Sequence, residues 1–431
     1  MAYSESSLPN LASVMQLRTR KAQEFAKVES SLQEAQNIKV PQEKSDITSW
    51  LTKLSIFRPF AKPVSDNEIV WLLDNTAFKC PCAGVWQAEF VAAVFKRHDK
   101  LKVIDMVSSV LRAVGLTDDA PERKRIEERV LPFLWDICPG KIVTAVQQSS
   151  KLNLGPSSAN GLSLKLVAVP NSKTGSLVSA STKLGGGIGS ITEMQTFYAG
   201  EGGWGVISGM GNSFPRFHFP ISTPRDAHEK PDIDDTIKVT MTSDPVGILR
   251  ETFVNTPSPI VGMPELYAEI KSFLPQDTAW FYLSASPYNL YPFLKQFRKQ
   301  YYPPGTLILR DSSWKTIAGL LTALTVGTQE YKVDRMKKVC GWFPMRKMIA
   351  IGDSTQSDPE AYGEFYRSSP NWIRLILIRK ATNIAEIGID EKNKAERFEA
   401  AFKGVPRHAW HVFEDPAECV DIVKRTIREG Q

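Results

Sequence analysis

Residues 347–370, KMIAIGDSTQSDPEAYGEFYRSSP, decide the fold of the C-terminal half of this chain. The apolar run at 347–354 has the length and β-branched content of a buried strand, and it ends in the polar stretch IGDSTQSDPE (351–360). The spacing of apolar residues at 358–370 then predicts a helix. A strand, a polar loop and a helix in this order form the repeating unit of α/β proteins.

The same unit recurs on both sides of this stretch. The sequence predicts strands at 278–286, 305–311 and 372–380, and helices at 290–301 and 330–343. We therefore predict a Rossmann-like parallel sheet with flanking helices as the C-terminal domain, residues 226–431. In such sheets the functional site lies outside the carboxyl ends of the strands.

The residues before this domain have three different compositions. Residues 1–66 are predicted to be a polar, partly disordered lead-in, and residues 67–141 a small helical module, because Trp86, Phe90 and Val94 recur at helical spacing. Residues 142–225 are rich in Gly and Ser and are predicted to be β-rich and irregular. Within them, 162–169 alternates like a strand. The segment 182–214 shows no period and is predicted to be a long loop or linker, since its glycines fit no phosphate-binding spacing.

Composition narrows the class of protein. The 431 residues are 42% hydrophobic and 23% charged, as in a globular protein. The net charge of +6 is diffuse, which argues against nucleic acid as a partner. No apolar run reaches the length of a transmembrane helix, and the five scattered cysteines suit a reducing compartment. We therefore expect a cytoplasmic protein without a transmembrane segment.

The first part of this domain contains carboxylates and a hydroxyl suited to phosphate chemistry. Asp232 and Asp234 lie in HEKPDIDDTIKVT (228–240). Two carboxylates at this spacing can divide phosphoryl transfer, one attacking phosphorus and the other moving a proton. Ser284 closes the strand at 278–286, where its hydroxyl and backbone N–H can hold a phosphate oxygen.

Later loops supply a cation and a second acidic pair. Lys332 is a point charge suited to a site shared by a carboxylate and a phosphoryl group. Asp353 follows a strand, and Asp358 lies five residues on. Carboxylates there suit Mg²⁺, which prefers oxygen ligands. Any one of these residues alone is more typical of a cap or a surface position, and their order along one α/β domain is what indicates a site.

This order resembles that of the haloacid-dehalogenase-type (HAD-like) phosphohydrolases. The stretches DIDDTIKVT, FYLSASPYNLYPFL, YKVDRMKKV and IGDSTQSDPEAYGEF more closely resemble the catalytic domain of the fungal actin-patch-associated, Mg²⁺-dependent phosphatidate phosphatases. The resemblance covers roughly 232–422, and the stretch at 67–140 also looks like the N-terminal region of that family.

The resemblance implies a role for each candidate residue. Asp232 would be the phosphorylated nucleophile and Asp234 the general acid and base, and Lys332 would steady the phospho-aspartate. Thr236 and Ser284 would bind the substrate phosphate. Asp353 would complete a Mg²⁺ site with Asp232 and Asp234, and Asp358 would orient the waters of the metal or Lys332.

The sequence before Asp232 differs from the family pattern, in which an apolar strand directly precedes the nucleophile. Pro231 is disfavoured in a central strand, and the nearest apolar stretch, FPRFHFPIS (214–222), is interrupted by prolines. Two interpretations remain open. Either the chain is a paralogue that lacks a working first strand, or a misplaced splice boundary has interrupted the sequence, which the aperiodic 182–214 segment favours.

The function implied is hydrolysis of phosphatidate to diacylglycerol and phosphate through an aspartyl-phosphate. The partner would be phosphatidate at membrane surfaces, with peripheral association with membranes or with cortical actin patches and their endocytic proteins. Two alternatives are a catalytically impaired scaffold at actin patches and a phosphatase for another phosphate ester.

Overall fold

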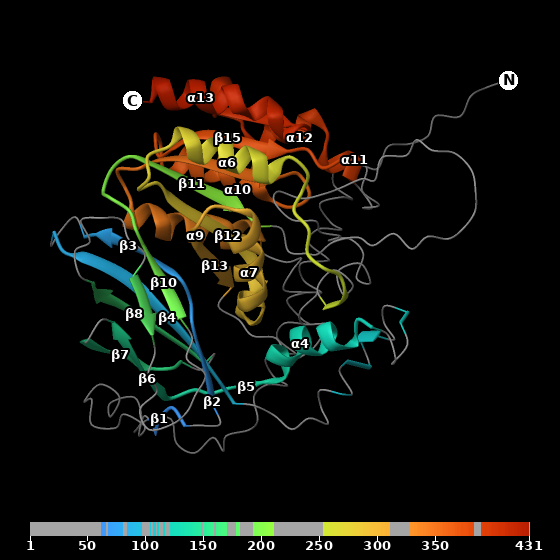
Figure 1. Ribbon diagram of the computed structural model, residues 1–431. Helices are drawn as coiled ribbons and strands as arrows, with labels where there is room; N and C mark the ends of the chain where they lie inside the picture. Colours follow the sequence, from blue (N-terminus) through green and yellow to red (C-terminus); the bar gives the residue numbers. More distant parts are fainter. Residues whose placement is uncertain are drawn as a thin grey trace, which may run out of the picture. The chain divides into compact units, whose positions relative to one another are not determined.

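The computed structural model describes residues 62–210, with gaps, together with 253–310, 328–382 and 389–430 (Figure 1). The gaps in the first range are 66–67, 81–83, 97–103, 105–106, 109, 112–114, 117–120, 148–149, 159–160, 170–177 and 182–192. Most of the expected lead-in, residues 1–61, therefore lies outside the described residues, as does 211–252 with Asp232, Asp234 and Thr236.

A six-stranded, all-parallel sheet forms the C-terminal half, in the order β13-β12-β11-β14-β15-β16. Its strands are β11 (Trp204–Gly209), β12 (Ala279–Pro287), β13 (Thr306–Arg310), β14 (Lys347–Asp353), β15 (Ile373–Arg379) and β16 (Trp410–Phe413). All four strands predicted in this half are confirmed, as is the parallel sheet. Their residues are mostly buried along the whole strand, as expected when helices cover both faces.

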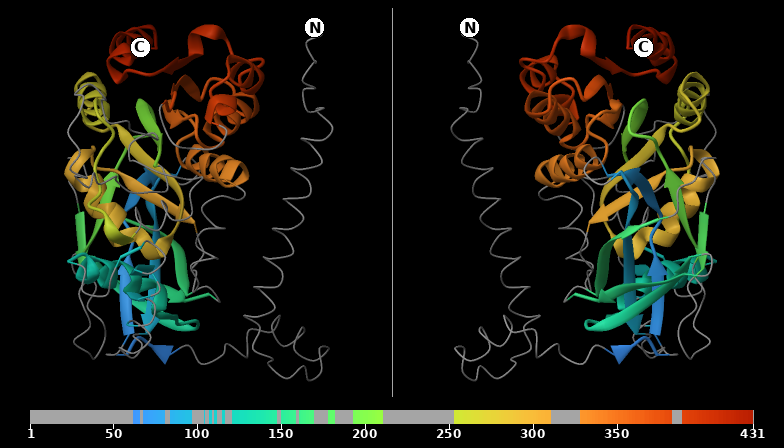
Figure 2. Two further views of the ribbon diagram at one scale, coloured as in Figure 1. Left: turned by 90° about the vertical axis from the view of Figure 1, so that its right-hand side faces the viewer. Right: turned by 90° about the vertical axis from the view of Figure 1, so that its left-hand side faces the viewer.

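Helices pack on both faces of this sheet (Figure 2). On one face lie α6 (Met263–Phe273), α7 (Tyr291–Tyr301) and α13 (Cys419–Glu429). On the other lie α9 (Thr328–Trp342), α10 (Asp358–Ser368) and α12 (Ala395–Ala401). Alternation along β11 sends Val206 into the first core and Ile207 into the second. The predicted helices at 290–301, 330–343 and 358–370 are confirmed as α7, α9 and α10.

Strand β11 argues against the first of the two open interpretations, in which the chain lacks a working first strand. It lies between β12 and β14, at the centre, and every residue of WGVISG is buried. The sequence predicts a loop or linker over 182–214. That prediction is wrong for β11 and for β10 (Glu193–Tyr198). Strand β11 is too short, and its sequence too rich in glycine, to show a period of its own.

A second sheet of ten strands is formed by the described residues between 62 and 198. Its strands are β1 (Lys62–Pro63), β2 (Glu68–Leu72), β3 (Asn75–Lys79), β4 (Trp86–Lys96), β5 (Asp136–Ile137), β6 (Lys141–Gln147), β7 (Ser150–Pro156), β8 (Leu162–Ala168), β9 (Val178–Ser181) and β10. Strand β4 pairs with β8 across the boundary predicted at 141/142, so both predicted regions contribute to one sheet. The predicted strand at 162–169 is confirmed as β8.

The expected helical module at 67–141 is therefore wrong for most of its described length. Helix α4 (Arg123–Leu134) is present, but Trp86 to Lys96 forms the longest strand, β4. That strand pairs with β2, β3, β5 and β8 and is largely buried in its second half. A short apolar run that is buried on both faces cannot be distinguished from a buried helix by its spacing.

Ion pairs join the ten-stranded sheet to helix α7, which packs on the six-stranded sheet. The buried carboxylate of Asp74, just after β2, contacts Lys295 Nζ at 2.8 Å and Arg298 Nη2 at 3.4 Å, both on α7. The hydroxyl of Tyr291 accepts a hydrogen bond from the backbone N–H of Asp74 at 2.6 Å. Helix α7 follows β12 directly, so this contact links the N-terminal sheet to the carboxyl end of β12.

Candidate active site

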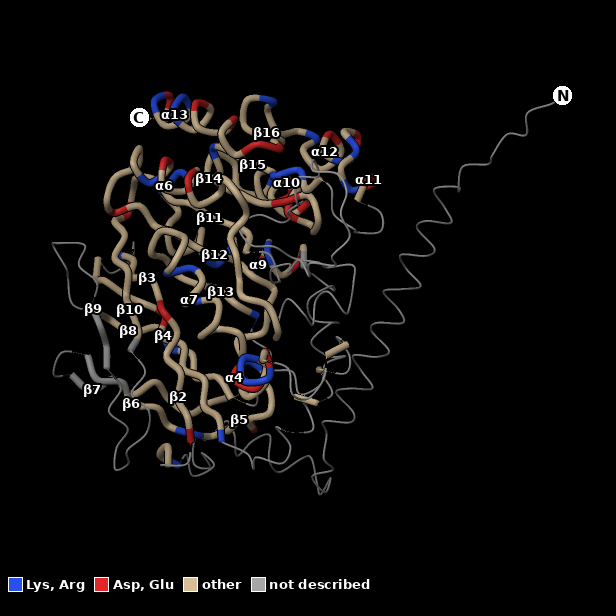
Figure 3. The backbone as a smooth tube through the Cα atoms, turned by 45° about the vertical axis from the view of Figure 1, so that its right-hand side comes forward, with Lys and Arg blue, Asp and Glu red and all other residues tan. Residues whose placement is uncertain are grey.

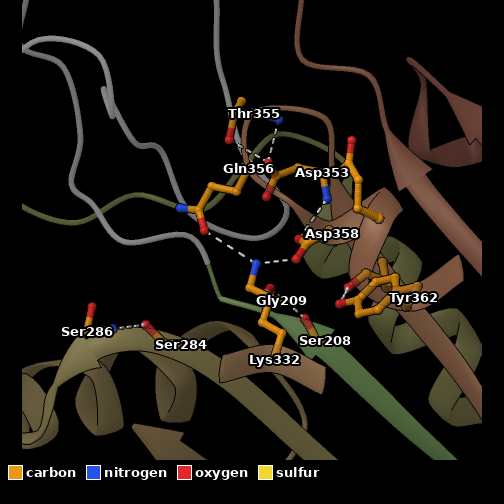
Figure 4. A network of polar contacts seen from close by, with 12 residues as sticks. Ser208, Gly209, Ser284, Ser286, Lys332, Asp353, Thr355, Gln356, Asp358 and Tyr362 are labelled. Atoms are coloured by element: carbon orange, nitrogen blue, oxygen red, sulfur yellow. Dashed lines mark hydrogen bonds and ion pairs between the residues drawn. The ribbon is translucent and has the colours of Figure 1, made fainter. Parts of the chain in front are cut away.

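The order in which strands are added to the six-stranded sheet reverses at β11. From β11 the chain adds β12 and β13 on one side, and then β14, β15 and β16 on the other. Ligands of open α/β sheets bind at such a switch point. Ser208 and Gly209 of β11, Ser284 of β12 and Asp353 of β14 all lie at the carboxyl edge of the sheet (Figure 4).

Lys332 and Asp358 form an ion pair beside this edge. Lys332 Nζ of α9 contacts Asp358 Oδ1 at the start of α10, and the two side chains are 3% and 0% exposed. Burial raises the pKa of Asp358 to about 6, against the lowering effect of Lys332. The carboxyl of Asp358 is therefore ionised at neutral pH and holds the ammonium group in one place.

Asp353 and Asp358 share one loop and are joined through it. Asp358 Oδ2 accepts a hydrogen bond from the backbone N–H of Asp353 at 3.2 Å. Asp353 Oδ1 in turn accepts from the backbone N–H of Thr355 at 2.8 Å and from its hydroxyl. Gln356 Oε1 lies 3.3 Å from Lys332 Nζ, and its buried Nε2 has no hydrogen-bond partner among the described residues.

Gly352 makes the position of Asp358 possible. A Cβ at this residue would lie 2.6 Å from Asp358 Cβ and 2.7 Å from its Oδ2. Only a residue without a side chain lets the loop fold back so closely onto the end of β14. Tyr362 lies in the same space and donates a hydrogen bond to the carbonyl of Ile351 at 3.1 Å.

Ser284 lies on the neighbouring strand β12. It is fully buried, and its Oγ accepts a hydrogen bond from the backbone N–H of Ser286 at 3.1 Å. Of the predicted site residues, the structure brings Lys332, Asp353 and Asp358 into one connected network and sets Ser284 at the same edge of the sheet.

The central strand ends without an acid. Ser208 Oγ accepts a hydrogen bond from the hydroxyl of Tyr267 at 2.6 Å, and Met210 is buried and donates its N–H to the carbonyl of Leu283 at 2.8 Å. The predicted acidic pair, Asp232 and Asp234, follows β11 only after residues 210–231. The pair and Thr236 lie outside the described part of the chain.

The described residues supply part of a site for Mg²⁺. None of their His, Cys, Asp and Glu side chains gather in a group of three or more that could hold a metal ion. The buried carboxylate of Asp353 is a hard oxygen donor of the kind that Mg²⁺ prefers. Both oxygens of Asp358 already accept hydrogen bonds, from Lys332 and from Asp353 N–H, which fits the role of orienting the lysine.

Sequence reasoning missed several polar residues of this site. Thr355 and Gln356 lie within the loop from Asp353 to Asp358, here called the acidic loop, and Arg397 binds it from α12. Only their contacts reveal that they belong to the site. Strand β11 had a usable signal, because Trp204, Val206 and Ile207 lie in a short stretch with glycines before and after it. The long Gly-rich segment around it obscured that signal.

No helix among the described residues is both long enough and apolar enough to cross a membrane.

Residues 231–380 match the family described as the catalytic domain of phosphatidate phosphatase APP1. The chain is also 32% identical over 200 residues to phosphatidate phosphatase APP1 of Saccharomyces cerevisiae. That match covers 46% of this chain and 30% of the yeast protein. Residues 231–380 are therefore similar to the catalytic domain of phosphatidate phosphatase APP1.

Proposed function

We propose that this chain is a Mg²⁺-dependent phosphatidate phosphatase with a HAD-like catalytic domain. The observation that carries the proposal is the buried network of Lys332, Asp353 and Asp358 at the carboxyl end of a switch-point sheet. The family match of residues 231–380 supports the reaction class, and the name of the yeast relative supports the substrate.

The proposed reaction has two steps. Asp232 attacks the phosphorus of phosphatidate, an Asp–O–P bond forms, and the bond between phosphorus and the glycerol oxygen breaks. Asp234 gives its proton to that oxygen, which leaves as diacylglycerol. Asp234 then takes a proton from water, which attacks the aspartyl-phosphate and releases inorganic phosphate and free Asp232.

The described residues would hold the charges of this reaction in place. The ammonium group of Lys332, fixed by Asp358, would lie beside the phosphoryl group and stabilise the negative charge on its oxygens. The buried Nε2 of Gln356, Thr236 and Ser284 are the proposed donors to phosphate oxygens. Asp353, Asp232 and the carbonyl of Asp234 would hold Mg²⁺, which when bound neutralises charge on the phosphoryl group.

The amphiphilic substrate requires contact with a lipid surface. We therefore propose peripheral association with membranes and, from the family resemblance, with cortical actin patches and their endocytic proteins. In a flotation assay, a larger fraction of the purified protein should float with vesicles that contain phosphatidate than with vesicles of phosphatidylcholine alone.

One observation favours a second candidate function, a catalytically impaired scaffold. The central strand β11 ends in Ser208 and Gly209 instead of leading directly into the acidic pair. Phosphate release from phosphatidate in mixed micelles, compared with release from small phosphate esters, tests both candidates. Activity on phosphatidate supports the phosphatase, activity on small esters alone indicates another substrate, and no activity on either supports the scaffold.

A further inference from the structure

Arg397 of α12 lies against the acidic loop and donates from every N–H of its guanidinium group. Its Nε and Nη2 bind the two carboxylate oxygens of Glu360 at 2.7 and 2.9 Å. Nη1 donates to the carbonyls of Ser354 and Lys392, and Nη2 also donates to the carbonyl of Gln356. Arginine has five N–H donors in a rigid fork, and here each has an acceptor.

These contacts hold the backbone of the acidic loop from outside. Arg397 donates hydrogen bonds to the carbonyls of Ser354 and Gln356. Lys392 Nζ donates to the carbonyl between them, that of Thr355, at 2.6 Å. Three successive carbonyls are thus bound by the α11 (Ile389–Lys392) and α12 segment. Figure 3 shows Lys and Arg together with Asp and Glu around α10, α11 and α12.

The opposite side of the same peptides faces the site. With its carbonyls bound outside, the loop directs the N–H of Thr355 to Asp353 Oδ1 at 2.8 Å. The side chain of Gln356 reaches Lys332 Nζ at 3.3 Å. Arg397 therefore binds the Ser354 carbonyl of the peptide group whose N–H, that of Thr355, donates to Asp353. It also binds the carbonyl of Gln356, whose side chain contacts Lys332.

The pair with Glu360 fixes Arg397 relative to α10. Glu360 lies in the first turn of that helix, two residues after Asp358, and both of its oxygens are bound by the guanidinium. The Nε–Oε1 pair is partly exposed, 19% for Arg397 and 32% for Glu360, so its charge attraction is modest. Its geometric effect is larger, because a bidentate contact defines the orientation of both groups.

We propose that Arg397 is the positioning residue of the acidic loop, setting the orientation of the Asp353 carboxylate and of Lys332 for the proposed phosphatase reaction. This rests on the proposed function only for its consequence in catalysis. Lysine at this position would keep the charge but lose the planar fork, and would leave carbonyls of the loop without a donor. The proposal therefore predicts that charge alone does not replace Arg397.

Hydrogen–deuterium exchange of the full chain tests the proposal without any need for activity. In Arg397→Lys, amide exchange over 353–358 should rise roughly tenfold, while β12 and β15 keep the rates of the unsubstituted chain. Arg367→Lys is the matched control, because Arg367 Nη1 likewise donates to two carbonyls, those of Ala401 and Lys403, away from the loop. Unchanged exchange over 353–358 in Arg397→Lys would overturn the proposal.

A Mg²⁺ titration separates positioning from general support. The Mg²⁺ concentration that half-protects 353–358 from exchange should rise roughly 10- to 100-fold in Arg397→Lys and stay unchanged in Arg367→Lys. Phosphatidate hydrolysis should show the same shift in Mg²⁺ dependence with little change in KM. Equal Mg²⁺ dependence in the two variants would contradict the proposal. Where the unsubstituted chain has no activity, the proposed function fails, and the exchange result still decides the role of Arg397.

Discussion

Lys332 and Asp358 form a buried ion pair between α9 and α10, with side chains 3% and 0% exposed. Asp358 also accepts the N–H of Asp353, so a single carboxylate connects the cation of the site to its other acid. This contact joins segments that the sequence separates, and it is the structural basis of the proposed chemistry.

Replacement of Asp358 by Asn should destabilise the protein, because it leaves the charge of Lys332 buried without a counter-ion. We expect a loss of about 3–5 kcal/mol in the free energy of unfolding. Urea denaturation at pH 7.5 is suitable, since burial raises the pKa of Asp358 only to about 6 and its carboxyl is then ionised. The control is Glu414→Gln, which removes an exposed pair with Lys380 and should cost about 1 kcal/mol or less. Equal losses in the two variants would contradict this reading of the pair.

Replacement of Gly352 by Ala should displace Asp358. The added Cβ would lie 2.6 Å from Asp358 Cβ, a separation that the tightly packed loop must relieve by moving. We expect a loss of about 1–3 kcal/mol in stability, together with a lower rate of phosphatidate hydrolysis. Gly202→Ala, where a Cβ meets nothing within 4 Å, should behave like the unsubstituted chain. A fully active Gly352→Ala variant would show that the position of Asp358 is unimportant for the rate.

Removal of the charge of Lys332 should slow hydrolysis without preventing binding to lipid. In Lys332→Met we expect kcat to fall by about 10²–10³-fold, because in the proposed mechanism this charge stabilises the transferring phosphoryl group. Lys337→Met alters an exposed lysine on the same helix and serves as the control. Steady-state kinetics in mixed micelles provide the measurement. If both variants lose activity equally, the effect belongs to the helix and not to the ammonium group.

A variant that lacks residues 209–231, so that Ser208 is followed directly by Asp232, should hydrolyse phosphatidate faster than the full chain. Asp232 would then take the place of Gly209 at the end of β11, and Ile233 would take the place of the buried Met210. Exchange of one apolar side chain for another of similar size costs less than about 1.5 kcal/mol. Direct placement of the acids opposite Lys332 should raise phosphatidate hydrolysis by roughly 100-fold.

The control for this joined variant is its own Asp232→Asn derivative, which should have no activity. A joined variant that folds, as judged by circular dichroism and thermal unfolding, but hydrolyses phosphatidate no faster than the full chain would contradict the prediction. It would also indicate that the acids reach the site in the full chain without being joined to β11.

The sequence predicted the catalytic sheet well because its units repeat. The four predicted strands were apolar runs of strand length, and the helices α7, α9 and α10 had apolar residues at helical spacing. The predicted order of Ser284, Lys332, Asp353 and Asp358 could be read for the same reason, since each lies in or directly after one of these elements.

The remaining features depend on contacts distant in sequence. Strand β4 has the spacing of a helix, and only its pairing with β2, β3 and β8 makes it a strand. Strand β11 is six residues long, and its central place is set by pairing with β12 and β14. The contacts of Arg397 with the acidic loop could not be predicted, because the loop carbonyls that it binds lie 41 and 43 residues away in sequence.

The central claim is that Asp232 is the nucleophile of a phosphatidate phosphatase. Release of inorganic phosphate from phosphatidate in mixed micelles with Mg²⁺, compared between the full chain and Asp232→Asn, tests it most directly. The account predicts hydrolysis by the full chain and none by Asp232→Asn. Hydrolysis at an unchanged rate in Asp232→Asn would contradict the mechanism.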